Sequence, residues 1–426
     1  MKKDVFKFLI KEFHETPFID LLERELKLPS TKKIISLVGS RRAGKTFYFY
    51  QLMKEFAEKI SLSKDRMVYI NFEDDRLFPL EITDLNDLLE AYFELYPSNK
   101  EKEIYFFFDE IQNVDNWEVF VRRLNDKEKA KIFVTGSSSK LLSREIATAL
   151  RGRTMVFQLF PLSFKEFLRF QGIKIEKDFE YSSARFKIKK AFEEYLEFGG
   201  FPEVALEKQV VLKHKILNNY FEMFIYRDLV ERFSVRNTVL LKNLAKFLIT
   251  NISTLFSINA YYRAVSKEIA AGKDTILEYV SDLEEINLIY LVSVFSHSVK
   301  KQQLNPKKVY CIDNGLRNAV SFKFSKDEGR LAENLVFVEL KRREKEIFYW
   351  KNKNEVDFVI KNNDSSLEAV NVSYANDIND REINGLIEFK QNFKKTKKLT
   401  IITKDTEKKE KGINFVPLWK WLLTEI

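Results

Sequence analysis

The sequence predicts an α/β protein whose N-terminal part is a three-layer domain built on a parallel β-sheet. Two observations lead to this prediction: short apolar runs recur along the first third of the chain, and stretches with helical spacing separate them. A run that is apolar throughout is typical of a parallel strand buried on both faces. The predicted strands are Ile34–Val38, Met67–Phe72, Ile104–Phe108, Ile132–Val134 and Thr154–Phe160.

Helical patterns flank this domain on both sides. An amphipathic lead-in helix is expected over residues 1–30, because four apolar residues recur there at helical spacing. These residues are Val5, Phe8, Leu9 and Phe13. The α/β domain is expected over residues 31–165, and a helical segment over 166–235 that is broken once, at Gly199–Pro202.

The C-terminal half has two further patterns. Short helices followed by the apolar run Ile289–Phe295 give residues 236–305 the element order of a winged helix. Residues 306–426 have the mixed pattern of a small α+β domain. Its predicted strands are Lys308–Ile312, Ile347–Lys351, Val356–Ile360, Leu367–Val372 and Leu399–Thr403.

Composition excludes several classes of protein. A single Cys311 and three scattered histidines exclude a disulfide framework and a zinc cluster. No apolar run is long enough to span a membrane and the first residues are charged, so we expect a cytoplasmic protein without membrane contact. The net charge of +9 favours an anionic partner such as nucleic acid, although lysine-rich surfaces also serve solubility alone.

The turn after the first predicted strand matches the phosphate-binding pattern G-x-x-x-x-G-K-[ST] completely, and a helical run, Phe47–Lys59, follows it. The two glycines let the backbone curl so that its N–H groups face a phosphate, and the following helix directs its positive end at the same anion. Lys45 is expected to neutralise the β- and γ-phosphates of ATP, and the Thr46 hydroxyl to bind Mg²⁺. The predicted nucleotide-binding residues are Gly39, Ser40, Arg41, Arg42, Ala43, Gly44, Lys45, Thr46 and Phe47.

An acidic pair follows the third predicted strand. Asp109 and Glu110 come directly after the run Ile104–Phe108, at the carboxyl end of a strand, where ligands bind in open α/β sheets. We expect Asp109 to hold Mg²⁺ and Glu110 to orient and polarise the attacking water. The chain is therefore predicted to be a Mg²⁺-dependent ATPase.

Two more positions are candidates for catalysis. Ser137 follows the fourth strand, where a hydroxyl can reach the γ-phosphate; its neighbour Ser138 is an alternative, and a helix N-cap is another role for either residue. Arg153 lies just before the fifth strand, where ring-forming ATPases present an arginine to the nucleotide of the neighbouring subunit. A homo-oligomer, with a ring as one form, is expected on this basis. The alternative is that Arg151 and Arg153 are an ordinary surface pair.

Taken together, these motifs resemble those of archaeal and bacterial AAA-type P-loop ATPases with a C-terminal winged helix and a restriction-endonuclease-like domain. The resemblance covers nearly the whole chain and implies an ATPase core, a helical lid segment, a winged helix and a nuclease-like fold. The matching segments are Gly39–Thr46, Phe108–Gln112 with Trp117, Thr135–Ser138, Leu150–Arg153, Pro161–Phe167, Tyr195–Val204, Pro306–Leu316, Gly329–Glu333 and Asn354–Phe358.

The nuclease-like part departs from the pattern that metal-dependent cleavage needs. Glu333 and Asp357 are suitably placed acidic residues, but the next strand has Asn371 and Ser373 where Glu or Gln and then Lys are expected. A register that starts at Glu368 also lacks the lysine, whose charge would stabilise the transition state. The domain is therefore predicted to be an inactive scaffold.

The predicted winged helix also lacks a basic recognition helix. Its candidate recognition helix, 274–285, buries Ile276, Val280 and Leu283 and carries five acidic residues, which the DNA backbone would repel. If this region contacts DNA, the candidates lie around the wing; the alternative is that they are lysines on a solvated loop. These candidates are Lys300, Lys301, Lys307 and Lys308.

Two functions remain open at this point. The first is an oligomeric motor or remodeller that acts on nucleic acid, which the basic charge and Arg153 favour. The second is an ATP-controlled switch or interaction scaffold with slow turnover, which the acidic helix and the missing nuclease lysine favour.

Overall fold

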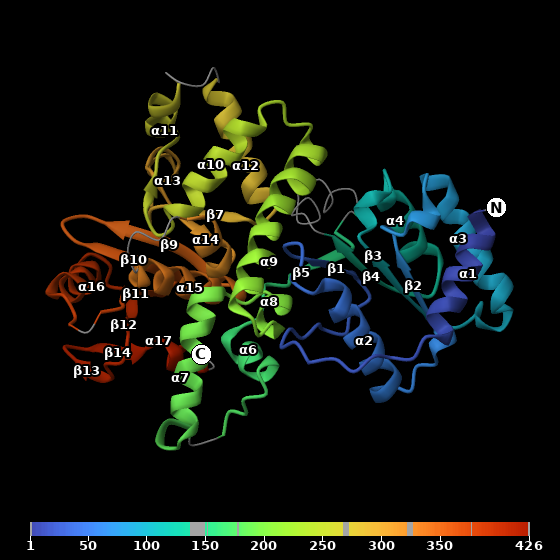
Figure 1. The fold of residues 1–426 in the computed structure, drawn as a ribbon, viewed down its shortest axis with the longest axis horizontal. Coiled ribbons are helices and arrows are strands. Elements are labelled where there is room, and N and C mark those ends of the chain that lie inside the picture. The colour runs from blue at the N-terminus through green and yellow to red at the C-terminus, as the bar shows by residue number, and fades with distance from the viewer. Residues whose placement is uncertain are drawn as a thin grey trace. The chain divides into compact units, whose positions relative to one another are not determined.

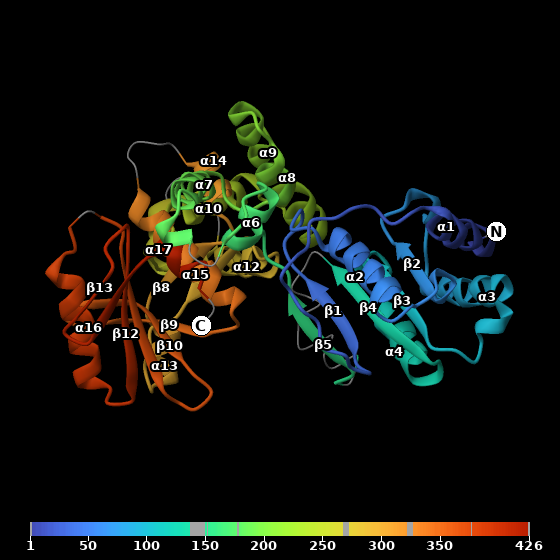
Figure 2. The same ribbon diagram turned by 90° about the horizontal axis from the view of Figure 1, so that it is seen from below.

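The chain forms two compact units in a computed structural model, Met1–Leu159 and Phe160–Ile426, and each is described here by itself. The structure describes residues 2–136, 150, 152–176, 179–266, 272–321, 327–375 and 377–424. Figure 1 and Figure 2 show the elements of both units in two views. No helix in these ranges combines the length and the apolar character that crossing a membrane requires.

The first unit is built on a five-stranded parallel sheet with the order β2-β3-β4-β1-β5. Every residue of β1 and β3 is buried, as expected for strands that are apolar throughout. All five strands fall on the predicted runs, which confirms the predicted parallel sheet. They are β1 (Ile34–Val38), β2 (Met67–Asn71), β3 (Ile104–Asp109), β4 (Ala130–Gly136) and β5 (Thr154–Gln158).

Helices cover both faces of this sheet. Along β3, the side chains of Phe106 and Phe108 pack into the core with α1, α3 and α4, and Phe107 packs into the core with α2. This alternation confirms the three-layer architecture. The helices are α1 (Lys2–Glu15), α2 (Lys45–Lys59), α3 (Leu85–Leu95) and α4 (Trp117–Lys127).

The N-terminal segment differs from the prediction. The helix expected over residues 1–30 ends at Glu15, directly before Thr16-Pro17, because a residue that precedes proline is disfavoured in helical geometry. Phe8 of the expected apolar face is 57% exposed, and Phe6 and Ile10 are buried instead. Residues 16–33, which we call the N-terminal strap, are neither helix nor strand.

The second unit begins with helices. They confirm the helical pattern and its break, since α7 ends at Phe198 and α8 begins at Pro202. The helices are α6 (Phe164–Phe170), α7 (Ala184–Phe198), α8 (Pro202–Leu206) and α9 (Val210–Met223), continued by a π-helical segment, Phe224–Glu231.

Next come a helix, a strand, two helices, a strand, a helix and a strand, and the three strands form an antiparallel sheet with the order β6-β8-β7. In α12, Ile276, Val280 and Leu283 are buried as predicted. The elements are α10 (Thr238–Thr250), β6 (Leu255–Phe256), α11 (Ile258–Val265), α12 (Lys273–Glu285), β7 (Ile289–Val292), α13 (Val299–Leu304) and β8 (Lys307–Cys311).

The remaining residues form a six-stranded mixed sheet with the order β13-β14-β12-β11-β10-β9. Its strands are β9 (Glu346–Lys351), β10 (Glu355–Lys361), β11 (Leu367–Ser373), β12 (Thr396–Thr403), β13 (Lys408–Glu410) and β14 (Ile413–Pro417). The accompanying helices are α14 (Asn314–Val320), α15 (Glu328–Arg342), α16 (Asp380–Asn392) and α17 (Leu418–Trp421).

One contact joins the glycine pair after α7 to the residues before α14. Asp313 is buried, and its carboxylate accepts hydrogen bonds from the backbone of Gly200 at 2.6 Å and of Gly315 at 2.8 Å. Burial raises the pKa of Asp313 to about 6, although these backbone donors oppose the shift. The two segments are therefore parts of one buried junction within the second unit.

Candidate nucleotide site

The phosphate loop, Gly39–Thr46, lies where the sequence predicts it, between the carboxyl end of β1 and the start of α2. Gly44 has φ of 96°, in the left-handed region that favours glycine. At Gly39, an added Cβ would lie 2.2 Å from the carbonyl oxygen of Leu159, so only glycine fits. The backbone geometry of the first unit therefore explains why glycine occupies both fixed positions of the motif.

The side chain of Lys45 lies inside this loop and contacts its backbone. Its Nζ donates to the carbonyl oxygens of Gly39 at 3.1 Å and Ser40 at 3.3 Å, and its side chain is buried. Ser40 is also buried, and its hydroxyl has no hydrogen-bond partner among the described residues. An ammonium and an orphaned hydroxyl directed at the same loop suit a phosphate, which accepts from both.

Thr46 and Asp109 meet across the sheet edge. The Thr46 hydroxyl donates to Asp109 Oδ2 at 2.6 Å, and the same oxygen accepts from the Tyr69 hydroxyl at 3.2 Å. The other oxygen of Asp109 accepts from the Thr135 hydroxyl on β4. Burial raises the pKa of Asp109, and the neighbouring charge of Glu110 adds to the effect. A hydroxyl and a carboxylate in contact are the oxygen ligands that Mg²⁺ prefers.

Glu110 follows in an unusual backbone conformation. Its φ is 51°, which is uncommon for a residue other than glycine, and its backbone N–H donates to Thr135 Oγ1 at 2.9 Å. Its carboxylate accepts from Gln112 Nε2 at 2.6 Å and lies 3.5 Å from Lys45 Nζ. Burial alone would raise the pKa of Glu110, but the charge of Lys45 and the Gln112 hydrogen bond outweigh it, so the pKa is lowered. Glu110 is therefore held as a carboxylate.

Thr135, Tyr69 and Gln112 are site residues that sequence reasoning missed. Thr135 and Gln112 stand inside segments that the motif analysis covered, but no pattern distinguishes their side chains from those of neighbouring residues. Tyr69 lies on β2, which was predicted as a strand, but none of its residues was assigned to the site. β4 lies between β1 and β3 in the sheet, and the Thr135 hydroxyl near its end contacts both Asp109 and the backbone of Glu110.

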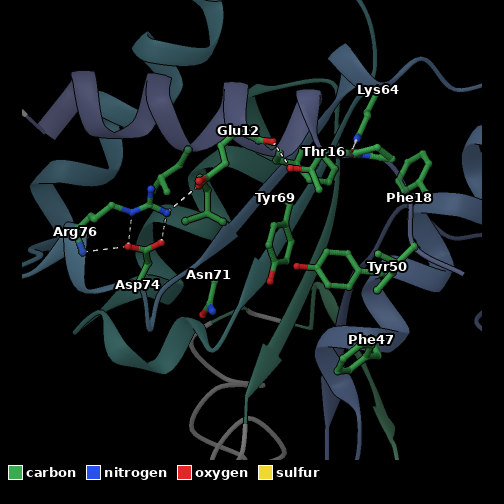
Figure 3. Close-up of a pocket in the computed structure, with 15 residues that line it drawn as sticks. Glu12, Thr16, Phe18, Phe47, Tyr50, Lys64, Tyr69, Asn71, Asp74 and Arg76 are labelled. Carbon is green, nitrogen blue, oxygen red and sulfur yellow. Dashed lines mark hydrogen bonds and ion pairs between the residues drawn. The ribbon is translucent and has the colours of Figure 1, made fainter. Parts of the chain in front are cut away.

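A pocket of about 420 Å³ lies beside α2, lined by α1, the N-terminal strap and the end of β2 (Figure 3). Aromatic rings form much of its wall, and Figure 3 shows the hydroxyl ends of Tyr50 and Tyr69 pointing toward each other. Arg76 forms ion pairs with Asp74 at 2.6 Å and Glu12 at 2.8 Å on another side. Because Tyr69 also donates to Asp109, this pocket shares a wall with the acidic pair.

The other predicted residues of the loop have different surroundings. Arg41 pairs with Glu73 at 3.2 Å, and the Arg42 side chain is exposed. Phe47 is 58% exposed and lines the pocket rather than the loop itself. Ser137 and Ser138 lie outside the described residues.

Arg153 lies immediately before β5, at the edge of the sheet where the strands begin. Its carbonyl accepts from the backbone N–H of Ile34 at the start of β1, at 2.8 Å. Its guanidinium pairs with Asp126 of α4 at 2.7 Å. The phosphate loop lies at the carboxyl ends of the strands, whereas Arg153 lies at their amino ends. Arg153 is therefore remote from the nucleotide site of its own chain.

A second charged cluster occurs in the C-terminal part and corrects the expectation for Lys308. That residue is 2% exposed rather than on a solvated wing. Its ammonium lies 2.7 Å from Glu355, 2.8 Å from Asp357 and 3.2 Å from Glu333. Burial alone would lower the pKa of Lys308, but these carboxylates outweigh it and raise that pKa well above its usual value. Lys308 therefore cannot reach DNA.

The two predicted acidic residues of the nuclease-like part are both in this cluster. Asp357 accepts from the backbone N–H of Val372 at 2.9 Å, and Glu333 accepts from the Tyr310 hydroxyl at 2.7 Å. Burial and the charge of Asp357 raise the pKa of Glu333 to about 8. Asn371 donates to Glu382 at 2.9 Å and accepts from the backbone of Asp357. Among the described residues, no group of three or more His, Cys, Asp or Glu is arranged to hold a metal ion.

Comparison with known proteins gives matches along most of the chain. The model of the AAA domain matches residues 31–168, and two domains of unknown function, DUF8612 and DUF4143, match residues 189–327 and 328–421. The uncharacterized protein MJ1544 of Methanocaldococcus jannaschii is 39% identical over 94% of this chain and 90% of its own length. An uncharacterized protein of Haemophilus influenzae is 31% identical over 94% of this chain and 97% of its own length.

Solved structures give weaker similarities. The Walker-type ATPase of Pyrococcus abyssi is 13% identical with a TM-score of 0.41, over 75% of this chain and 95% of that one. The Aeropyrum pernix Orc1 protein, solved in complex with DNA, is 11% identical with a TM-score of 0.31, over 75% of this chain and 91% of that one. At these TM-scores neither structure bears on the function of this chain.

Proposed function

Because this chain belongs to the family of AAA-domain proteins that includes MJ1544 of Methanocaldococcus jannaschii, we propose that it binds ATP with Mg²⁺ and hydrolyses it. The observation that carries this proposal is the meeting of the phosphate loop and the acidic pair at one edge of the sheet. Thr46 contacts Asp109 at 2.6 Å, and Lys45 lies 3.5 Å from Glu110. Open parallel sheets bind their ligands at this edge.

Each residue has a role that its contacts support. Lys45 neutralises the phosphates, and the backbone N–H groups of the loop orient them. Thr46 and Asp109 would hold Mg²⁺, which would supply positive charge against the phosphates. Thr135 holds Asp109 and the backbone of Glu110 in one arrangement, so that the Glu110 carboxylate can orient the attacking water.

Glu110→Gln is expected to retain ATP binding and to lower the turnover rate about 10²-fold, because an amide polarises water far less than a carboxylate does. Single-turnover hydrolysis at saturating ATP, together with an ATP titration, separates the two effects. Asp115→Asn, an exposed acidic residue before α4, is the matched control and should hydrolyse ATP at the wild-type rate. Unchanged turnover in Glu110→Gln with intact binding would contradict the assigned role.

We propose further that hydrolysis drives an oligomeric motor or remodeller on nucleic acid. The formal charge of +9 and the place of Arg153 at the far edge of the sheet support this. The alternative, a slow ATP-controlled switch, is supported by α12, where Asp274 and Glu278 are exposed. A motor's ATPase rate should rise several-fold when DNA or RNA is added, whereas a switch's rate should not. Size measurements with and without ATP report the assembly.

For the C-terminal domain we propose a scaffold without nuclease activity. The ammonium of Lys308 lies among the carboxylates that would otherwise bind Mg²⁺. It thereby takes the place of the metal ion as the positive charge that these carboxylates face. The cation comes from β8 of the three-stranded sheet and the carboxylates from α15 and β10. The cluster would thus join two parts of the second unit.

The wild-type protein is therefore expected to leave DNA intact with Mg²⁺ or Mn²⁺, and Asp357→Ala to lower stability rather than activity. Losing a charged hydrogen-bond partner of a buried lysine should reduce the free energy of unfolding by about 1.5–3 kcal/mol. Urea unfolding measures this. Glu346→Gln, which breaks an exposed ion pair with Lys361, is the control and should change it by less than about 0.5 kcal/mol. Metal-dependent cleavage that disappears in Asp357→Ala would contradict the scaffold proposal.

A further inference from the structure

The N-terminal strap brings a buried arginine to the phosphate loop. Arg24 is 6% exposed, and its Nη1 donates to the carbonyl oxygen of Ala43 at 2.8 Å. Ala43 is the residue directly before Gly44, in the middle of the loop that should cradle the phosphates. Arg24 precedes that loop in the sequence, and no motif of the site includes it.

The strap is itself fixed along α2. Gln51 accepts from the backbone N–H of Arg24 at 2.8 Å and donates to its carbonyl oxygen at 3.4 Å. The Tyr48 hydroxyl donates to the carbonyl oxygen of Leu26 at 2.8 Å. Gln51 is buried, so these contacts are shielded from water. The backbone of Arg24 is thus bound to the same helix that begins within the phosphate loop.

The contact with Ala43 fixes the direction of one peptide group. In a planar trans peptide, the C=O and the following N–H point in opposite directions. When the Ala43 carbonyl points to the guanidinium, the N–H of Gly44 points away from it. Gly44 has a positive φ, in a region where glycine is conformationally permissive, so a contact that fixes this peptide group restricts an otherwise adaptable backbone.

We propose that Arg24 is a positioning residue of the nucleotide site, which holds the Gly44 N–H ready for a phosphate oxygen. This rests on the proposed ATP binding and extends it to a residue outside every motif of the site. The contact acts on the loop backbone and not on a base or a sugar. It therefore serves any nucleoside di- or triphosphate, and ATP and ADP should depend on it equally.

The test compares Arg24→Met with the wild-type protein. Losing a preoriented donor should raise the Kd for both ATP and ADP about tenfold. It should raise KM for ATP by the same factor and leave kcat within about twofold, because the acidic pair is untouched. Arg24→Lys keeps a cation and one donor and should recover part of the affinity. Calorimetric titration and steady-state kinetics supply these values.

Two further variants separate positioning from folding. Gln51→Met releases the backbone of Arg24 while the guanidinium remains, and it should also weaken nucleotide binding. Lys54→Met breaks only an exposed pair with Asp20 of the strap, 3.1 Å apart, and should bind as the wild type does. If Arg24→Met proves unfolded, Arg24→Lys and Gln51→Met decide the question.

The outcomes distinguish this inference from the function on which it rests. Wild-type nucleotide affinity in folded Arg24→Met would overturn the positioning role and leave ATP binding standing. A wild-type protein that binds neither ATP nor ADP would overturn the nucleotide site itself. A fall in kcat without a change in KM or Kd would also overturn the positioning role, because Arg24 would then act on hydrolysis.

Discussion

Lys45→Ala is expected to lose measurable ATP binding, with an affinity at least about 10²-fold below that of the wild type. The lysine is the one buried cation of the loop, since Arg41 pairs with Glu73 and the Arg42 side chain is exposed. Removing it would also take away the charged donor that the carbonyl oxygens of Gly39 and Ser40 share. Charge-assisted hydrogen bonds of this kind each contribute about 1.5–3 kcal/mol.

Isothermal titration with ATP and Mg²⁺ measures the effect, and a thermal melt shows whether the variant is folded. Lys59→Ala removes an exposed lysine of the same helix, paired with Glu55 at 2.6 Å, and should bind ATP normally. Near wild-type affinity in Lys45→Ala would refute the assignment of the nucleotide site.

Arg153→Ala is expected to bind ATP normally and to lose most turnover, by a factor of about 10³ if it acts as an arginine finger. Within one chain the guanidinium lies at the edge where β5 begins and pairs with Asp126. It can therefore serve hydrolysis only when a second subunit presents it. The wild-type ATPase rate per subunit should then rise with protein concentration.

Mixing variants tests this directly. Lys45→Ala has a dead site but keeps its arginine, so adding it to Arg153→Ala should partly restore turnover. Asp126→Asn removes the ion-pair partner of Arg153 and keeps the arginine, and it should retain activity. If Arg153→Ala hydrolyses ATP normally as a monomer, the arginine is an ordinary surface residue and the ring loses its support.

The parts of the fold that were predicted correctly are those that local sequence determines. The strands from Ile34 to Gln158 follow from apolar runs, and the phosphate loop follows from fixed spacing of glycines and lysine. The lead-in helix was predicted too long because it was extended past Pro17, although the apolar residues that indicated it all precede this proline, which ends the helix.

The rest depends on contacts between distant segments. Arg24 reaches the loop only because the strap folds back along α2, and Thr135 contacts Asp109 only because β4 lies between β1 and β3. Lys308 was placed in a predicted strand, but a strand has two faces and the sequence does not say which one carries an acidic neighbour. Its partners come from residues 25 to 49 positions away.

The buried Lys308 cluster also changes what the net charge of the protein means. The formal +9 counts every residue, including those shielded from solvent. In the cluster one ammonium faces Glu333, Glu355 and Asp357, so its own charge is negative even when Glu333 is protonated. The remaining residues then sum to more than +9. A polyanion that contacts the surface away from the cluster would therefore meet residues whose summed charge exceeds +9, and its binding there would weaken with added salt.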